Sequence, residues 1–152
     1  MVFSTACSSY QDWQSFLFFY HAHKVSQPGR VTRIASGCTA GQQKQLIEFH
    51  ASTISNLSPD FCIHFTPDYS NLSGDGYKYY NKPFGLKHWF EQGLSYSENV
   101  EKLEDAIIMV LDPDMILLRP LTYDFTGSNV LLHNANGRRV PLTAPWKVMH
   151  GR

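Results

Sequence analysis

Blocks of apolar residues with two different periods follow one another along this chain of 152 residues. Short apolar runs indicate strands at residues 2–4, 31–35 and 61–65, and each run stops at small or polar residues. Between the runs, apolar residues recur three and four positions apart, which is the period of a helix. This spacing predicts helices at residues 11–23, 42–51 and 81–93. Alternating strands and helices predict an α/β fold with a doubly wound, mostly parallel sheet.

Residues with special backbone preferences mark the ends of these elements. Ser8 and Ser9 are start signals for the first helix, and Pro28-Gly29 is a turn dipeptide. Pro83 falls in the first turn of the third helix, where its missing N–H is tolerated. Aromatic and aliphatic residues at helical spacing are predicted to be core: Trp13, the whole cluster of residues 16–20, Leu86, Trp89 and Phe90.

A fourth strand carries the most informative motif. The uninterrupted apolar run at residues 106–111 predicts a strand covered on both faces, and Asp112-Pro113-Asp114 ends it. Parallel sheets bind ligands at the carboxyl ends of their strands. If the backbone stays extended through Pro113, the two carboxylates can share one divalent cation, Mn²⁺ or Mg²⁺ rather than Zn²⁺. The alternative is a solvated β-turn, since Asp-Pro-Asp is good turn chemistry.

Two further groups of residues are candidates for binding an anionic nucleotide. Arg33 lies near Ser36 and Gly37, where a guanidinium and exposed backbone amides can meet a uracil or a diphosphate. A surface salt bridge explains Arg33 equally well. Asn81 and Lys82 open a helix whose N-terminus favours anions. The alternative makes Asn81 the N-cap and leaves Lys82 solvated.

Composition and charge narrow the function class. The 13 basic and 13 acidic residues balance, so no basic patch indicates nucleic-acid binding. No leader and no apolar stretch near the roughly 20 residues of a membrane span are present, so we expect one soluble domain. Cys7, Cys38 and Cys62 lack zinc-site spacing, and packing is their expected role, with one disulfide plus a free thiol as the alternative.

Five groups of short motifs in the first 125 residues resemble plant and algal peptidyl serine α-galactosyltransferases and their relatives, the hydroxyproline O-arabinosyltransferases. They occur in this order: Phe3-Ser4-Thr5; Tyr10-Gln11-Asp12-Trp13-Gln14; Gln27-Pro28-Gly29 with Thr32-Arg33-Ile34 and Ser36; Asn81-Lys82-Pro83-Phe84-Gly85 with Trp89; and Leu111-Asp112-Pro113-Asp114-Met115-Ile116 with Pro120.

The resemblance implies a GT-A type fold, of which residues 1–152 form the N-terminal nucleotide-sugar-binding part, incomplete at the C-terminus. It implies transfer of a sugar from a UDP-linked donor to serine or hydroxyproline hydroxyls of hydroxyproline-rich cell-wall proteins. Galactosyl transfer fits the motifs better than arabinosyl transfer. By the same resemblance, Asp112 and Asp114 handle the cation, and Thr5, Arg33 and residues 81–83 shape the donor pocket.

The resemblance also implies a protein of the Golgi or endoplasmic reticulum lumen whose membrane anchor lies outside this chain. Ala6 departs from the family, which often has an acidic residue there. The family continues past Arg152, so acceptor-binding and catalytic groups are expected in that further part, and the fragment alone is expected to be inactive. The rival hypothesis from another class is a noncatalytic α/β module that mediates protein contacts.

Overall fold

The computed structural model describes residues 1–72, 74, 77–94, 107–122, 131–133 and 139–141. The chain divides into two compact units, Met1–Pro120 and Leu121–Arg152. The second unit contains a short antiparallel pair, β5 (Leu131–His133) with β6 (Arg139–Pro141). Within the described residues, no helix has the length and apolarity required to cross a bilayer.

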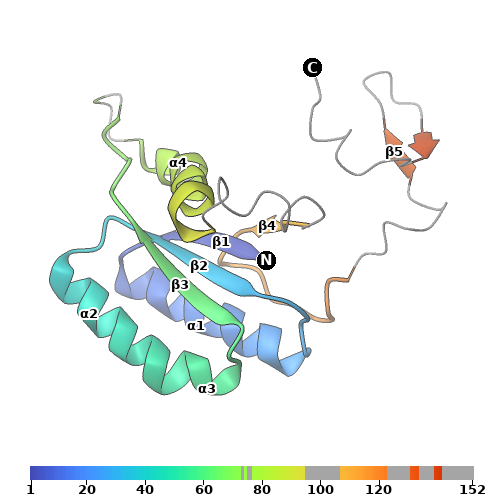
Figure 1. The fold of residues 1–152 in the computed structure, drawn as a ribbon, viewed down its shortest axis with the longest axis horizontal. Coiled ribbons are helices and arrows are strands. Elements are labelled where there is room, and N and C mark those ends of the chain that lie inside the picture. The colour runs from blue at the N-terminus through green and yellow to red at the C-terminus, as the bar shows by residue number, and fades with distance from the viewer. Residues whose placement is uncertain (73, 75–76, 95–106, 123–130, 134–138, 142–152) are drawn as a thin grey trace. The chain divides into compact units, whose positions relative to one another are not determined.

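The first unit is built on a four-stranded parallel sheet (Figure 1). Its strands are β1 (Val2–Ala6), β2 (Val31–Ser36), β3 (Phe61–Thr66) and β4 (Val110–Leu111), in the spatial order β3-β2-β1-β4. The chain therefore adds strands on one side of β1 and then crosses to the other side. This order confirms the predicted α/β fold, because a reversal of strand order next to β1 defines a doubly wound sheet.

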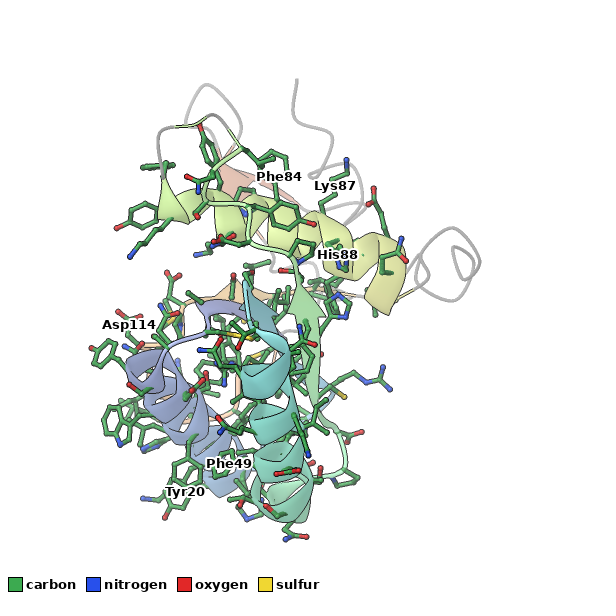
Figure 2. All side chains as sticks on the ribbon, turned by 90° about the vertical axis from the view of Figure 1, so that its left-hand side faces the viewer. Tyr20, Phe49, Phe84, Lys87, His88 and Asp114 are labelled. Atoms are coloured by element: carbon green, nitrogen blue, oxygen red, sulfur yellow. A yellow bond between two sulfur atoms is a disulfide. The ribbon has the colours of Figure 1, made fainter. Side chains whose placement is uncertain are left out.

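Helices cover both faces of this sheet. One face carries α1 (Ser9–Lys24), α2 (Ala40–Phe49) and the short α3 (Ser55–Leu57), with a π-helical segment, His50–Ile54, between the last two. Figure 2 shows Tyr20 and Phe49 on these helices, and Phe84, Lys87 and His88 on α4, across the sheet.

The helix on the opposite face is α4 (Asn81–His88). A 3₁₀ turn, Lys78–Tyr80, precedes it, and a π-helical turn, Trp89–Gly93, follows it. The predicted helix at residues 81–93 thus exists, but its last turn widens.

Side-chain caps fix where the first two helices begin. The Ser8 hydroxyl accepts a hydrogen bond from the Gln11 backbone N–H at 3.3 Å, which confirms the predicted start signal. Thr39 and Gln42 form a capping box at the start of α2, with Thr39 N–H donating to Gln42 Oε1 at 2.9 Å. Each cap satisfies backbone donors that a helix N-terminus leaves without an intrahelical partner.

The core beneath α1 is aromatic, and the prediction of core residues on α1 is confirmed in part. Phe18 and Phe19 are buried against Phe3, with ring centroids 4.5 and 5.4 Å apart. Trp13 and Tyr20, predicted as core, are 60% and 43% exposed. The error has a simple cause: five consecutive aromatic or aliphatic residues, 16–20, support more than one helical face, and the sheet buries only one of them.

The fourth strand is also not what the apolar run predicted. β4 has two residues, lies at the edge of the sheet and pairs only with β1 among the described strands. Ile107 and Val110 are 56% and 40% exposed. A strand with one neighbour in the sheet buries its side chains less completely than a central one, so the prediction of a strand covered on both faces is wrong. Ala106 lies outside the described residues.

A disulfide joins the loops that follow β1 and β2. Cys7 and Cys38 are bonded, with their Cα atoms 5.1 Å apart, and Cys62 is a free thiol. The expected packing role is therefore wrong for this pair, and the alternative of one bridge plus a free thiol is correct. Spacing along the sequence did not decide this, because the two cysteines are 31 positions apart and meet only through the parallel pairing of the two strands.

Candidate functional site

The candidate residues gather near the carboxyl ends of the parallel strands, but on two faces of the sheet. Thr5 and Arg33 lie on the face covered by α1, where Arg33 contacts the Asp12 side chain. Ser36 lies on the face covered by α4, against Gly85. The parallel register places Thr5 beside Ala35, the residue before Ser36. Thr5 and Ser36 therefore lie near the same end of the sheet, and their side chains point to opposite faces.

Arg33 is buried and fully engaged by two partners. Its Nε donates to the Thr5 hydroxyl at 2.9 Å, and its Nη2 donates to Asp12 Oδ1 at 2.6 Å. The residue is only 3% exposed. Burial lowers the pKa of the Arg33 guanidinium from its ordinary value, while the hydrogen bond and charge of Asp12 oppose that shift. The predicted salt bridge therefore exists, with a buried Arg33 side chain and an Asp12 side chain that is 39% exposed.

A network of polar side chains joins β2, β3 and the loop after β3. The Thr66 hydroxyl donates to Ser36 Oγ at 2.8 Å, and both side chains are buried. The Gly37 N–H donates to the Thr66 carbonyl at 3.0 Å, and Gly37 has φ of +74°. A Cβ at Gly37 would lie 3.0 Å from Asp68 Cβ, so a larger residue there conflicts with both backbone and neighbour. Ser36 and Gly37 thus shape this loop.

Asn81 extends the same network to the start of α4. Its Oδ1 accepts from the Tyr69 backbone N–H at 2.6 Å, and its Nδ2 donates to Asp68 Oδ1 at 3.0 Å. Hydrogen bonds from the Ser70 backbone N–H and from Asn81 hold the pKa of Asp68 below its usual value. Asn81 is therefore not the N-cap: Tyr80 occupies that position, and the Asn81 side chain fixes the loop after β3.

Lys82 connects α4 to the end of β4. Its Nζ lies 2.5 Å from Asp112 Oδ1, and the two side chains are 43% and 51% exposed. Lys82 is therefore solvated, as the alternative interpretation predicted, and it also pairs with Asp112. Pro83 follows in the first turn of α4 as predicted and is exposed. The contact shows that Asp112 accepts a hydrogen bond from the Lys82 ammonium at a position open to solvent.

The backbone around Asp112 turns and does not remain extended. The Met115 N–H donates to the Asp112 carbonyl at 3.3 Å, which closes a β-turn over Pro113 and Asp114. The turn that was the alternative interpretation is thus present, with both aspartate side chains exposed. No third His, Cys, Asp or Glu of the described chain joins them as a potential metal ligand.

Two exposed carboxylates nevertheless fit one kind of metal site. Mg²⁺ is commonly held by one or two carboxylates together with substrate phosphates and water, without a complete cage of protein ligands. Asp112 and Asp114 offer hard oxygen ligands next to an open surface, and Lys82 already places positive charge on one of them. The donor set therefore suits a cation shared with a diphosphate.

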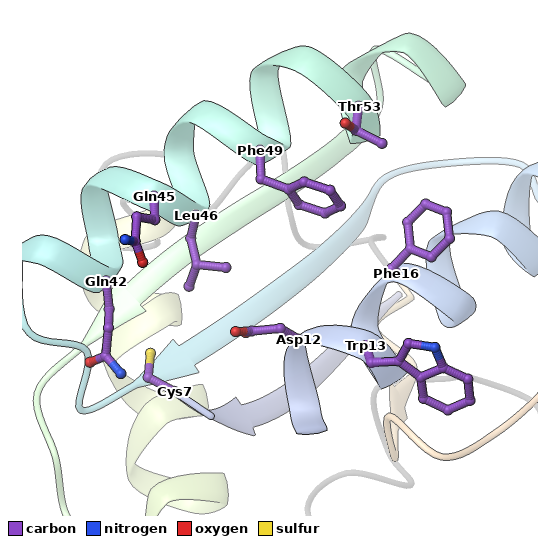
Figure 3. A pocket seen from close by; sticks show the side chains of 9 residues that line it. All are labelled: Cys7, Asp12, Trp13, Phe16, Gln42, Gln45, Leu46, Phe49 and Thr53. Atoms are coloured by element: carbon purple, nitrogen blue, oxygen red, sulfur yellow. The ribbon is translucent and has the colours of Figure 1, made fainter. Parts of the chain in front are cut away.

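A separate pocket of about 500 Å³ lies between α1 and α2 (Figure 3). It is lined by Cys7, Asp12, Trp13, Phe16, Gln42, Gln45, Leu46, Phe49 and Thr53. None of Lys82, Asp112 and Asp114 lines it, so this pocket is not the predicted cation site. Asp12 contributes its carboxylate to the pocket wall while Arg33 binds it from the interior.

A comparison with family models now places the chain. Residues 1–130 match the hydroxyproline O-arabinosyltransferase family N-terminal domain. The chain belongs to this family. The match includes β1 to β4, the buried Arg33 pair and the Lys82–Asp112 contact, so the residues described above are those of the family domain. The family resemblance predicted from the short motifs is thereby confirmed.

Curated relatives of this hydroxyproline O-arabinosyltransferase family member carry a more specific name. The chain is 31% identical over 153 aligned positions to a peptidyl serine alpha-galactosyltransferase of Arabidopsis thaliana, covering 99% of the chain and 16% of the relative. It is 30% identical to a peptidyl serine alpha-galactosyltransferase of Chlamydomonas reinhardtii, covering 84% of the chain and 15% of the relative. The chain thus spans about one sixth of these proteins. No solved structure is detectably similar to it.

One pair of side chains in this family domain was not singled out from the sequence. His64 Nε2 lies 2.9 Å from His88 Nδ1, which joins β3 to α4. Burial, and next the charge of His88, lower the pKa of His64. The two residues are 24 positions apart, and only the packing of α4 on the sheet brings them together. Sequence spacing therefore carried no signal for this contact.

Proposed function

We propose that this chain is the nucleotide-sugar-binding part of a glycosyltransferase that transfers galactose from a UDP-linked donor to serine or hydroxyproline hydroxyls of a protein. The observation that carries the proposal is the family match over residues 1–130. The names of the Arabidopsis and Chlamydomonas relatives favour galactose over arabinose and a protein acceptor. Arabinosyl transfer to hydroxyproline is the second candidate, which the family description favours.

Asp112 and Asp114 are proposed to hold Mn²⁺, or Mg²⁺, together with the donor diphosphate. A bound divalent cation would neutralise charge on the departing nucleoside diphosphate. Lys82 supports this assignment, because it lies on Asp112 Oδ1 and can turn from that carboxylate to a phosphate oxygen once a cation arrives. Exposure of both partners keeps the cost of such an exchange small.

The other predicted donor-pocket residues are proposed to act indirectly, by holding the loops around the donor in place. Ser36, Gly37 and Asn81 shape the loops at the carboxyl edge, and Pro83 sets the start of α4 beside Lys82. Thr5 and Arg33 are assigned as positioning residues, since their polar atoms bind each other and Asp12 inside the fold. The donor therefore meets the loops that these residues hold in place.

The Cys7–Cys38 disulfide supports a secretory location. Disulfides persist in oxidising compartments such as the endoplasmic reticulum lumen, and they are rare in the cytosol. We propose the endoplasmic reticulum or Golgi lumen, with a membrane anchor in a part of the protein outside this chain. Catalytic groups and further acceptor-binding groups are assigned to that further part as well, so the fragment alone is expected to be inactive.

Equilibrium titration of the full-length protein with UDP, with and without Mn²⁺, tests the proposal. We expect UDP binding that requires Mn²⁺, together with protection of the backbone amides of residues 111–115 from exchange. Asp114→Ala should abolish the Mn²⁺-dependent component, and Asp60→Ala, an exposed aspartate at the other end of the sheet, is the matched control. Full affinity and turnover in Asp114→Ala would defeat the metal assignment, and absence of UDP binding with or without Mn²⁺ would favour a noncatalytic module.

A further inference from the structure

An exposed row of aromatic rings lies beside the candidate donor site. We call it the aromatic row and define it as Tyr69, Tyr77, Tyr79, Tyr80 and Phe84. Each ring contacts the next one in the row. The centroid separations are 5.2 Å for Tyr79–Tyr77, 5.1 Å for Tyr77–Tyr80, 6.1 Å for Tyr80–Phe84 and 5.7 Å for Phe84–Tyr69. The five rings therefore form one continuous surface, not isolated side chains.

Three of the five rings are open to solvent, and Tyr69 and Tyr80 are half-buried. Tyr79 is 73% exposed, Tyr77 is 51% exposed and Phe84 is 39% exposed. Contiguous exposed apolar surface is a mark of binding sites in soluble proteins. Tyrosine is also a side chain that interfaces favour, because it presents a large rigid face and a hydroxyl that needs a partner. The row is thus suited to hold a ligand with both apolar and hydrogen-bonding character.

The position of the row connects it to the candidate donor site. Tyr80 and Phe84 flank Asn81, Lys82 and Pro83 at the start of α4, and Lys82 contacts Asp112. A ligand on the row therefore approaches the two carboxylates from α4. Figure 2 shows Phe84 on this helix, away from the α1 and α2 side of the sheet where the 500 Å³ pocket lies.

We propose that the aromatic row binds the acceptor polypeptide in its polyproline II form, an inference that rests on the proposed function. Proline-rich peptides adopt this helix without internal hydrogen bonds, so their carbonyl groups stay available to donors such as tyrosine hydroxyls. Aromatic-lined grooves are a recurring way to recognise them. One turn of the helix spans about 9 Å. Neighbouring rings of the row are 5.1 to 6.1 Å apart, so one turn of the peptide is longer than the separation of two adjacent rings.

The charges around the row agree with this occupant. Lys78 and Lys82 are the cationic side chains of the 3₁₀ turn and the first turn of α4, and each has a carboxylate near it, Asp68 for Lys78 and Asp112 for Lys82. A neutral chain of proline or hydroxyproline residues brings acceptor carbonyls and no positive charge. A single uracil ring, by contrast, can stack on one or two of the five rings only, so the row exceeds what a nucleotide base needs.

The test is a titration of the 152-residue chain with decaproline and, for comparison, with a ten-residue Gly-Ser peptide. We expect saturable binding of decaproline, monitored by tyrosine fluorescence or amide chemical shifts, and none of the Gly-Ser peptide. Tyr79→Ala should weaken decaproline binding by about tenfold. Tyr10→Ala is the matched control, because Tyr10 is 68% exposed on α1, outside the row.

Two outcomes overturn the inference. One is equal affinity for the two peptides, and the other is an equal loss in Tyr79→Ala and Tyr10→Ala. Tyr79→Phe offers a second variant that keeps the ring and removes the hydroxyl; a smaller loss than in Tyr79→Ala supports stacking with hydrogen bonding as the mode of contact. Mn²⁺-dependent UDP binding of the full-length protein is measured in parallel. Loss of UDP binding with decaproline binding retained refutes the proposed function, whereas the reverse refutes the aromatic row alone.

Discussion

Two cation–carboxylate pairs in this domain have the same chemistry but differ in how deeply the cation is buried. The Arg33–Asp12 pair is 2.6 Å long, and its side chains are 4% and 39% exposed. The Lys82–Asp112 pair is 2.5 Å long, with side chains 43% and 51% exposed. Arg33 also donates to Thr5 inside the fold, while the Lys82 ammonium faces solvent. Distance alone therefore says little about what each pair does.

Burial decides their roles. Breaking a buried ion pair leaves an uncompensated charge away from water, which is strongly destabilising. An exposed pair contributes little net stability, because water solvates both partners nearly as well when they separate. Arg33 and Asp12 accordingly hold α1 to β2, and under the proposed function Lys82 leaves Asp112 when a ligand arrives. The sequence motifs had assigned Arg33 and Lys82 the same donor-binding role, and the structure separates them.

The largest effect is expected from Asp12→Ala. Removing this carboxylate leaves the buried Arg33 guanidinium without its charged partner, so the free energy of unfolding should fall by about 3 kcal/mol in urea titrations. The matched variant Asp112→Ala should cost less than about 1 kcal/mol, since its pair is exposed. Equal losses in the two variants would contradict the distinction between the pairs.

A second, smaller loss is expected from Asn81→Ala. The substitution removes the acceptor for the Tyr69 N–H and a donor to Asp68, so the free energy of unfolding should fall by about 1–2 kcal/mol. Lys87→Ala on the same helix is the control, because its 3.8 Å contact with Glu91 is exposed and should contribute almost nothing. A control as destabilised as Asn81→Ala would remove the network as the explanation.

The fold was largely readable from the sequence because local signals agreed with one another. The Ser8 cap, the Pro28-Gly29 turn and the apolar runs of the three long strands each indicated the same alternation of elements. The face of α1 was not readable, because residues 16–20 are apolar on every side and only the sheet decides between Phe18 and Tyr20. The prediction of the length of β4 was wrong for a related reason: an apolar run reports hydrophobicity and not the number of neighbouring strands.

The sequence singled out two groups of candidate residues that the structure brings into contact, while their role in binding stays a prediction. The aspartates at the end of β4 were chosen as a carboxylate pair and the residues at the start of α4 as a helix N-terminus, and the two groups meet through Lys82 and Asp112. The burial of Arg33 could not be predicted, since Asp12 reaches it from a different element. The Cys7–Cys38 bond and the His64–His88 contact likewise join residues far apart in the sequence. Such pairs follow from topology, which single positions do not encode.

The His64–His88 pair extends the comparison to two groups that repel when both are charged. Because the pKa of His64 is lowered in the fold, the unfolded chain binds a proton at higher pH than the folded one. The contribution of neutral His64 to the free energy of unfolding is therefore fully present above about pH 6.5, and it is lost as the pH falls from there through the pKa of His64 in the folded chain. We expect the free energy of unfolding to decrease from pH 7 to pH 5, by less than in Asn81→Ala.

The matched variants for this pH dependence are His64→Gln and His23→Gln, the latter at an exposed position of α1. His64→Gln should flatten the profile between pH 7 and pH 5, and His23→Gln should leave it unchanged. The lowered pKa of Asp68 means that the contribution of its carboxylate to folding stability is lost at a lower pH than for an ordinary aspartate. An unchanged slope in His64→Gln would assign the acid sensitivity to other groups.

The smallest effect on stability, and the most informative for function, is expected from Lys82→Ala. The exposed pair contributes roughly 0.2–1 kcal/mol, so unfolding in urea should change by no more than that. Without Lys82, however, Asp112 loses its competing cation, and the affinity of the full-length protein for Mn²⁺ alone should rise by about two- to fivefold. Mn²⁺-dependent UDP binding should weaken at the same time, because the ammonium no longer reaches the diphosphate. Lys78→Ala, one turn earlier in the chain, is the control and should alter neither affinity. A fall in Mn²⁺ affinity in Lys82→Ala would mean that Lys82 orders Asp112 for the cation and does not compete with it.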